Sequence, residues 1–476
     1  MKTNGKDMRC LTTICLICSS ITMCGFSAAH AADLWDVYQL VKQNTPLLRQ
    51  AEADYKAAVE NKPIARSDLL PQLNVNATRE RDKYSGTTAG VTNNQVVQQQ
   101  LTLTNFSTYA QLQLTQTIFD WQDWVALAKA DAQAAQAAAS FDAARQSVII
   151  QTAQAYFNVL EARDILRVTK ADEQALAKQL HQAERRYQVG LSGIVNVQQA
   201  RAAHDQARAS VIQKRQSLIA AQQTLQALTK APVPNLKEPG DALPLDPPTP
   251  NDVDKWVDRA LKQNATLTAK KLAARVAAHE VDRQQAARYP DISVFASHNI
   301  NDVSSNNLLQ NQNLTGNFVG IQVTLPLFSG GAIAARSSQA KYQHVSAEAA
   351  RDQQALLVRS NTVTDFRDVV SGIASVKALR ESVKSNKASL SATEEAFKKA
   401  SSATTLDVLR ARENLLNAQT AYARARYSYL LSLLKLKQDA GTLGPKDVKA
   451  MSAYFTELPA GHESSAGAAP PAETGE

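Results

Sequence analysis

The sequence predicts an α+β fold built from two internal repeats, each with a pair of β-strands and very long α-helices. Three observations carry this prediction. Short landmarks recur about 210 residues further along the chain, four segments alternate apolar and polar residues, and two segments of more than about 60 residues contain almost no proline or glycine. Recurrence at a fixed spacing indicates repeated units, alternation indicates strands, and long uninterrupted stretches indicate helices.

The first 31 residues have the order of a secretory signal peptide. Three basic residues lie among the first nine, an apolar run extends from Leu11 to Phe26, and small residues surround Ala31. A short apolar stretch between a basic start and a small-residue site is typical of a leader that is removed. We therefore expect a signal peptide over 1–31, with cleavage after Ala31.

All four cysteines lie within this leader, at positions 10, 15, 18 and 24. The rest of the chain therefore offers neither a disulfide nor a thiolate metal ligand, and its scattered histidines lack the spacing of zinc ligands. Lipidation of Cys24 is an alternative that the bulky Met23 before it disfavours. We expect no cofactor, no metal site and no catalytic nucleophile, so the protein is predicted not to be an enzyme.

The formal net charge of +8 is spread along the chain without a block of like charge. This distribution does not favour binding to nucleic acid. After the leader, no apolar run approaches the roughly 18 residues that a membrane helix needs. If the chain enters a membrane, it is therefore expected to do so with strands.

Three landmarks of the first repeat return in the second. The paired segments are Leu70–Val75 with Tyr289–Val294, Leu112–Phe119 with Ile321–Phe328, and Ile194–Arg201 with Thr405–Arg412. Near-constant spacing over three separate landmarks indicates a duplication. The expected divisions are a first repeat over 32–230, a proline-rich connector over 231–250, a second repeat over 251–440, and a C-terminal segment over 441–476 with a disordered composition from about 457.

Each repeat contains two segments of alternating residues. In the first of them, Leu73 and Val75 point to one face of a strand, while Gln72 and Asn74 point to the other. Such alternation gives a strand one dry and one wet face. The expected strands are 72–82 and 108–119 around a polar loop at 84–105, and 291–300 and 317–328 around a polar loop at 301–315.

Two very long helices follow the strands. No proline or glycine occurs from Trp121 to Arg186, and only Gly372 interrupts the stretch from Ala332 to Ala400. A continuous helix of about 65 residues would be roughly 100 Å long. Apolar residues follow heptad-like steps in two adjacent rows, which indicates helical neighbours on both sides. We therefore expect long, coiled-coil-like helices arranged either as a sheet or as a cylinder, that is, an α-helical barrel.

Four strands per chain are too few to close a barrel, and an open sheet edge is not tolerated inside a membrane. Several chains must therefore combine. Three chains would supply twelve strands, an even number within the range of outer-membrane barrels, and about ten residues suffice for a tilted membrane strand. The sequence thus predicts that several chains together close an outer-membrane β-barrel, for which three would suffice. Its dry face would meet outer-membrane lipid, and the long helices would extend into the periplasm.

The order and the amino-acid sequences of the landmarks resemble those of the TolC family of outer-membrane efflux and type I secretion channels. The resemblance covers about residues 33–455 and rests together on Leu69–Leu73, Gln113–Asp120, Ala153–Leu160, Tyr187–Leu191, Leu325–Gly331 and Ala425–Leu430. It implies a homotrimer in the outer membrane of a Gram-negative bacterium, with a twelve-stranded β-barrel and a twelve-helix α-barrel. It also implies an exit duct that docks to a periplasmic adaptor (membrane fusion) protein and to an inner-membrane transporter of the RND or ABC class.

The two breaks between helices, Val189–Val195 and Ala400–Leu406, are expected at the far periplasmic end of the tube. By resemblance, this end is the narrowed entrance, where the family carries two aspartates three residues apart. Asp407 matches the first aspartate, whereas Arg410 occupies the position of the second. These two residues are also spaced to pair with each other on one helix face.

Other entrance positions also depart from the family pattern. The positions that hold the closed gate in the family are occupied here by Lys398, Ala403, Val195 and Asn196. The turns expected to face the adaptor contain Gly190, Leu191, Ser401 and Ser402. Our hypothesis is that the tube still closes at this end through a different set of contacts. The alternative is that Asp407 and Arg410 form a solvated surface pair.

A second function class is a non-membrane structural protein, namely a periplasmic or secreted coiled coil with small hairpins. Fractionation distinguishes the two classes, because a channel stays with outer membranes and a soluble coiled coil is extracted by buffer. Trp121 and Trp124 fit either a membrane-interface belt or a cap on the strand-to-helix junction. The cargo is not encoded in the tube: drugs, metals, metabolites and secreted proteins all fit such a duct.

Overall fold

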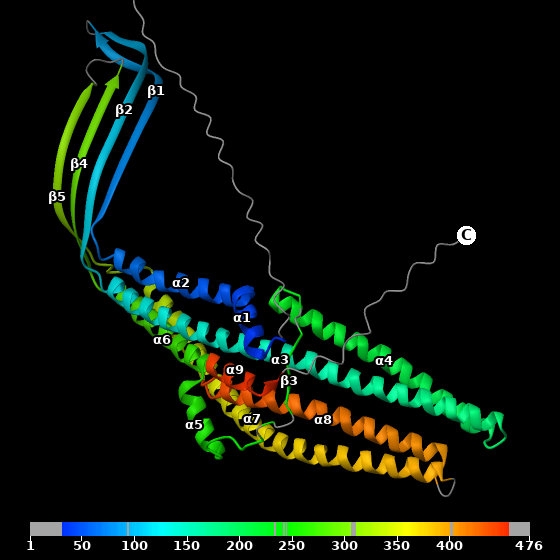
Figure 1. Ribbon diagram of the computed structural model, residues 1–476. Coiled ribbons are helices and arrows are strands. Elements are labelled where there is room, and N and C mark those ends of the chain that lie inside the picture. The colour runs from blue at the N-terminus through cyan, green and yellow to red at the C-terminus, as the bar shows by residue number, and fades with distance from the viewer. Residues whose placement is uncertain are drawn as a thin grey trace, which may run out of the picture.

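The computed structural model describes residues 31–92, 95–232, 235–240, 243, 245–305, 311–399 and 403–456. The predicted signal peptide, Cys24 and the tail from 457 lie outside these residues, apart from Ala31 at the cleavage site. A four-stranded sheet extends from one end of a set of long helices (Figure 1). Among the described helices, none is both long and apolar enough to cross a membrane.

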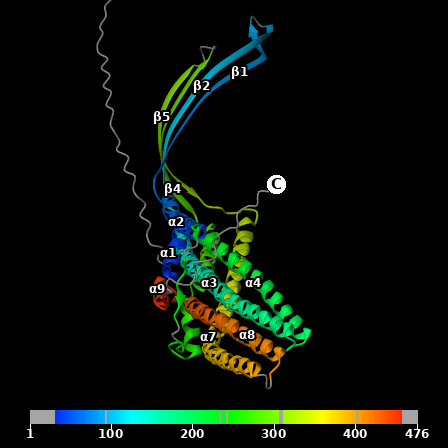
Figure 2. The ribbon, with the colours of Figure 1, turned by 45° about the vertical axis from the view of Figure 1, so that its right-hand side comes forward.

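The sheet is antiparallel throughout and has the strand order β1-β2-β4-β5. Its strands are β1 (Gln72–Thr92), β2 (Gln95–Phe119), β4 (Asp291–Ser305) and β5 (Gln312–Thr324). Figures 1 and 2 show the four strands curving together away from the helices. Beyond the Asn105–Ser305 pair, β2 continues, and its partner strand among the described residues is β1.

The prediction of a loop at 84–105 is wrong. Strands β1 and β2 pair continuously there, from Gln72 opposite Thr115 to Thr92 opposite Gln95. The loop predicted at 301–315 is likewise shorter, since strand pairing continues from Asp302–Asn313 to Val303–Gln312. Ladder hydrogen bonds join backbone groups and do not require apolar alternation, so polar segments also pair. The last strand ends at Thr324 instead of 328, and Pro326 beyond it has no N–H to donate.

The register gives the sheet one apolar face and one polar face. A row across all four strands on the apolar face consists of Leu73, Leu114, Ala296 and Val319. A matching row on the opposite face consists of Asn76, Gln111, Asn299 and Gly316. The apolar side chains are solvent-exposed in the single chain, with Val75 at 70% and Val319 at 81%. The predicted dry and wet faces are therefore present.

The two predicted long helices are confirmed. Helix α3 (Trp121–Gln188) has 68 residues and α7 (Ala332–Lys398) has 67, so each is roughly 100 Å long. Asp120 caps α3 by accepting a hydrogen bond of 2.7 Å from the backbone N–H of Gln122. Gly372 lies inside α7 without breaking it, and a Cβ there would make ordinary contacts with the ring, Cβ and Cα of Tyr429.

Each long helix has different neighbours along its length. Near the sheet, α3 packs against α2 (Pro46–Ser67) and α6 (Ala265–Ala286), and α6 also packs against α7. Farther from the sheet, α3 pairs with α4 (Ile194–Thr229) and α7 with α8 (Thr405–Asp439). The short helices α1 (Leu34–Asn44), α5 (Val253–Gln263) and α9 (Pro445–Ser452) lie around the middle of the long ones.

The main hydrophobic core lies in this middle region. The predicted apolar rows of α3 between Val148 and Leu166 are buried there apart from the half-buried Ala162, because the helix packs on α8, α4 and α1 at once. The rings of Phe157 and Phe455 stack at 6.1 Å, and Tyr427 donates a 2.7 Å hydrogen bond to the buried carboxylate of Asp164. Strand β3 (Glu238–Pro239) pairs with β6 (Phe455–Thr456), so the connector and the C-terminal segment are joined over this core.

Candidate functional site at the ends of the helix hairpins

The turn between α3 and α4 ends a helix in a well-defined way. Gly190 has a φ of +76°, the N–H of Leu191 donates to the carbonyl of Arg186 at 2.7 Å, and the N–H of Gly190 donates to Tyr187 at 2.9 Å. These bonds form a Schellman motif, which satisfies the last carbonyls of a helix and favours glycine at the left-handed position. The chain therefore reverses direction at Gly190 and returns as helix α4.

The turn between α7 and α8 is described from Ala403 onward, so Ser401 and Ser402 lie outside the described residues. Here Asp407 belongs to a capping box. The hydroxyl of Thr404 donates to the carboxylate of Asp407 at 2.7 Å, the N–H of Thr404 donates at 2.9 Å, and the N–H of Asp407 donates back to the Thr404 hydroxyl at 3.2 Å. Reciprocal bonds of this type start a helix at its N-terminus.

Asp407 is solvent-exposed and carries a stable negative charge. The hydrogen bonds from the backbone and side chain of Thr404 hold the pKa of its carboxyl below the usual range, and the positive charge of Arg410 acts in the same direction. Among the ion pairs of the described residues, none joins Asp407 to Arg410. The carboxylate is thus used by the cap, and the Arg410 guanidinium stays exposed to solvent.

The other predicted entrance residues make local contacts. Lys398 lies 3.4 Å from Glu395 on its own helix, and Asn196 donates a 2.9 Å hydrogen bond to the hydroxyl of Ser192 in its own turn. Val195 is 63% exposed. Within the described residues, none of these positions forms a hydrogen bond from one hairpin to the other.

A contact that sequence reasoning missed does connect the two hairpins. The guanidinium of Arg186, near the end of α3, lies 5.1 Å from the ring centroid of Phe397, near the end of α7. A guanidinium over an aromatic face is attracted by the ring quadrupole. The two residues are far apart in sequence and neither belongs to a motif, so no local signal could have identified the pair.

Two ion pairs at matching positions join the helices within each hairpin. Arg201 of α4 contacts Glu184 of α3 at 2.9 Å, and Arg412 of α8 contacts Glu394 of α7. Both pairs lie within about two helical turns of the hairpin end. The Arg412 side chain is 17% exposed, whereas Arg201 is 51% exposed, so the pair in the second hairpin is the better shielded from water.

The hairpin ends also expose a group of apolar side chains. Its members, all at least 39% exposed, are Tyr187, Val189, Leu191, Ile194, Val195 and Leu406. The α3–α4 and α7–α8 ends lie at the same end of the molecule, opposite the sheet (Figure 2). Contiguous exposed apolar residues at such a position are typical of a surface that binds another protein.

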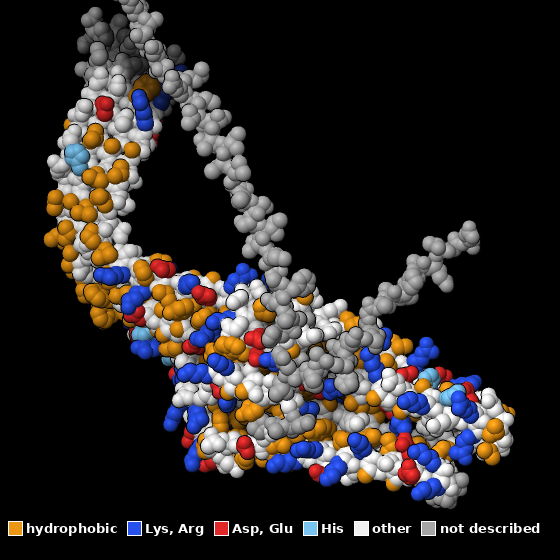
Figure 3. Space-filling model, viewed as in Figure 1, with side chains coloured by type: hydrophobic (Ala, Val, Ile, Leu, Met, Phe, Trp, Pro, Cys, Tyr) orange, Lys and Arg blue, Asp and Glu red, His pale blue; other side chains and the backbone are white. Residues whose placement is uncertain are grey.

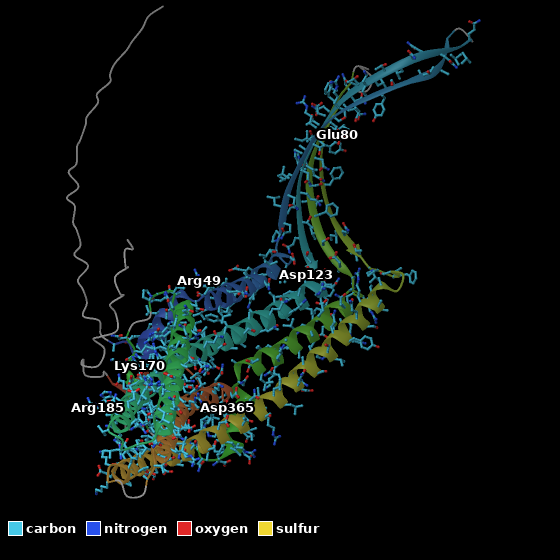
Figure 4. The ribbon with its side chains drawn as sticks, turned by 90° about the vertical axis from the view of Figure 1, so that its right-hand side faces the viewer. Arg49, Glu80, Asp123, Lys170, Arg185 and Asp365 are labelled. Carbon is cyan, nitrogen blue, oxygen red and sulfur yellow. The ribbon has the colours of Figure 1, made fainter. Side chains whose placement is uncertain are left out.

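A second group of charges, also missed from the sequence, lies where strands pass into helices. Burial, aided by the carboxylates of Asp120, Asp68 and Asp291, raises the pKa of Asp123 to about 6. Asp123 lies directly after β2 in Figure 4. Exposed aromatic and apolar residues, including Trp121, Trp124, Leu327 and Phe328, surround the same junction. The spacing of Asp120 and Asp123 after a strand was visible in the sequence, but their two partners come from other elements.

The model of the outer membrane efflux protein family matches residues 37–229 and 256–442. The chain belongs to this family. It is 32% identical to the outer membrane protein TolC of Escherichia coli K12 over 443 residues, covering 91% of this chain and 87% of that protein. It is also 27% identical to the alkaline protease secretion protein AprF of Pseudomonas aeruginosa, covering 91% and 89% of the two chains.

Solved structures of outer-membrane channels share the fold. The CmeC channel of Campylobacter jejuni superposes with a TM-score of 0.74 at 19% identity, covering 89% of this chain and 90% of that one. VceC of Vibrio cholerae gives a TM-score of 0.70 at 22% identity, covering 86% and 96%.

The predicted resemblance is therefore confirmed. The protein is an outer-membrane exit channel for efflux or type I secretion and is located in the outer membrane of a Gram-negative bacterium. The relatives that it matches are channel and secretion proteins and not enzymes. The alternative of a non-membrane coiled-coil protein is wrong.

Proposed function

We propose that three copies of the chain form one continuous duct, with a twelve-stranded barrel in the outer membrane and a helical barrel in the periplasm. The two-faced sheet carries this proposal. It has four strands, two free edges and an apolar face that the single chain leaves uncovered. A lipid-facing sheet must close on itself, and neighbouring chains provide the missing edges.

The proposed duct includes an internal duplication. The succession of a short helix, a medium helix, two strands, a very long helix and a returning helix occurs first as α1 to α4 and then as α5 to α8. Helix lengths agree between the two series, for example 36 residues in α4 and 35 in α8. With two equivalent halves in each of three chains, six similar units would surround the axis of the trimer. Such an arrangement gives the tube a nearly uniform wall.

The trimer is tested by mass. The signal-free chain, purified in detergent without boiling, is expected to have three times the mass of one chain by light scattering after correction for detergent. Insertion into a planar bilayer is expected to give a discrete conductance. A monomer, or a stable particle with another number of chains, would contradict the proposal.

We further propose that the hairpin ends form the periplasmic entrance and dock an adaptor protein that links the duct to an inner-membrane transporter. The exposed apolar side chains at the hairpin ends, such as Val189 and Leu191, support this assignment because they need a covering partner. Capture of adaptor and transporter by the tagged channel after cross-linking tests it. Replacement of Leu191 by Gln is expected to reduce capture. Leu356→Gln, at an equally exposed position of α7 far from the hairpin ends, serves as the control.

Asp407 provides the test of the entrance itself. The Asp407→Gln variant removes the charge but keeps a side chain that can complete the capping box, whereas Asp407→Ala removes both. If three such carboxylates surround the entrance, both variants should lower the cation selectivity of the conductance. If Asp407 serves only as a helix cap, only Asp407→Ala should change the conductance or its selectivity. Unchanged conductance and selectivity in both variants would reject Asp407 as an entrance residue.

A further inference from the structure

The middle of β1 separates charges by sign. Its sequence from Arg79 to Lys83 is Arg-Glu-Arg-Asp-Lys. Successive side chains of a strand point to opposite faces. Arg79, Arg81 and Lys83 therefore lie on one face, and Glu80 and Asp82 lie on the other. Figure 4 shows Glu80 about midway along β1, clear of the helices.

The basic residues share the apolar face of the sheet. Leu73 and Val75 precede them at odd positions of the same strand, and the pairing partners of those two residues, Leu114 and Leu112, are apolar as well. Farther along the face, Arg79 pairs with Thr108, and Arg81 pairs with Phe106. The Arg81 guanidinium lies 5.3 Å from the centroid of the Phe106 ring, which holds it on this face.

The height of the basic residues matches one surface of a membrane. On β4 the apolar face begins at Ile292, and Asp302 lies in the same row of the sheet as Arg79 through their shared partner Thr108. In strands tilted by about 40°, adjacent residues of one row differ in height by about 3 Å, so Arg79 lies within about 6 Å of the height of Asp302. About ten residues of strand span about 34 Å, or about 26 Å along the membrane normal at a tilt of about 40°. The apolar band of outer-membrane barrels is about 25 Å tall. The cations thus begin where the hydrocarbon ends.

Positive charge dominates this level of the face. Asp302 is the acidic side chain that the register places at the same height on the same face, against three cations on β1. The other described partners at this level, including Thr104, Thr108 and Asn313, carry no formal charge. Figure 3 shows Lys and Arg side chains at the upper part of β1, beyond a region of hydrophobic side chains on the strands.

We propose that Arg79, Arg81 and Lys83 bind the phosphate groups of glycolipid in the outer leaflet of the outer membrane. Guanidinium groups match phosphate oxygens in a bidentate manner, and the ammonium of Lys83 adds a mobile point charge. This leaflet is the appropriate one because β1 leads away from the helices from Gln72 onward and reaches the cations only after Leu73 and Val75 of the apolar band. The proposal rests on the closed barrel proposed above, which turns the apolar face outward.

The test measures binding of fluorescent bis-phosphorylated lipid A to the purified channel in mild detergent, with dephosphorylated lipid A as the second probe. The wild type is expected to prefer the phosphorylated form, and 0.5 M salt should weaken that preference. The variant R79Q/R81Q/K83Q should bind the phosphorylated form about tenfold or more weakly. The matched variant E80Q/D82N, which changes the opposite face of the same strand, should bind it as the wild type does.

Equal binding of both probes by the wild type would overturn the proposal without any variant, as would full affinity in R79Q/R81Q/K83Q. Conductance of the same preparations separates this outcome from failure of the barrel. A channel that conducts as a trimer but ignores the phosphates refutes only the lipid site. A chain that neither trimerises nor conducts refutes the proposed function.

Discussion

Gly441 follows the last turn of α8, where the helix meets the junction of α5 and α6. It has a φ of +71°, and its N–H donates to the carbonyl of Gln438 at 2.9 Å. A Cβ at this position would lie 2.9 Å from the backbone nitrogen of Asn264 and closer still to the carbonyl group of Gln263. Both atoms belong to the backbone and cannot rotate away, so the two helical segments would have to separate.

The Gly441→Ala variant should therefore lose about 2–5 kcal/mol of stability. The left-handed conformation of a residue with a Cβ contributes roughly 1–2 kcal/mol, and overpacking contributes about 1–3 kcal/mol. Gly190→Ala is the matched control. Gly190 also ends a helix with a φ of +76°, but a Cβ there meets nothing within 4 Å, so this variant should lose only the conformational part.

Thermal unfolding of the detergent-solubilised channels, followed by circular dichroism at one scan rate, compares the two variants. Gly441→Ala is expected to melt several degrees below Gly190→Ala, and Gly190→Ala slightly below the wild type. Equal melting temperatures of the two variants would refute the reasoning from backbone overlap.

Three further predictions test other contacts. Burial and the carboxylate of Asp439 raise the pKa of Asp365 to about 7. Ionisation of Asp365 therefore destabilises the folded state as pH rises from about 4 to 7. The melting temperature of Asp365→Asn should exceed that of the wild type by a margin that grows from pH 5 to pH 8. Replacing Arg186 by Gln or Phe397 by Leu removes the contact between hairpins, so both variants should spend more time in the open state in single-channel recordings. Glu394→Gln should speed amide exchange at its hairpin end more than Glu184→Gln does at the other, since the arginine partner of Glu394 is better shielded. Equal open times or equal exchange rates would contradict these two expectations.

The long helices and the sheet faces were predictable because each follows from a local pattern. The absence of helix breakers after Trp121 set the length of α3, and the alternation around Leu73 and Leu112 set the faces of the strands. The outer half of the first hairpin was not predictable in this way. From Tyr84 to Asn105 the sequence lacks apolar alternation, and the ladder there depends on backbone pairing with a strand that side-chain patterns do not reveal.

At the hairpin ends the sequence was informative about turns and less so about contacts. Gly190 was correctly placed in a turn, and its Schellman motif explains the glycine. Thr404 followed three residues later by Asp407 is a capping-box signature that was present in the sequence. The family resemblance assigned Asp407 to the entrance for its charge and not to the helix cap. The Arg186–Phe397 contact depends on how two hairpins pack, which no single segment encodes.

The part of the first hairpin that runs past Asn105 and Ser305 has a practical use. There β1 and β2 form a ribbon whose two outer edges have no strand beside them among the described residues, with Thr92 and Gln95 as the last pair. An epitope inserted between those two residues would lengthen the connection and leave the register below unchanged. On intact cells, antibody access to such an epitope would report directly that the ribbon emerges on the outer surface.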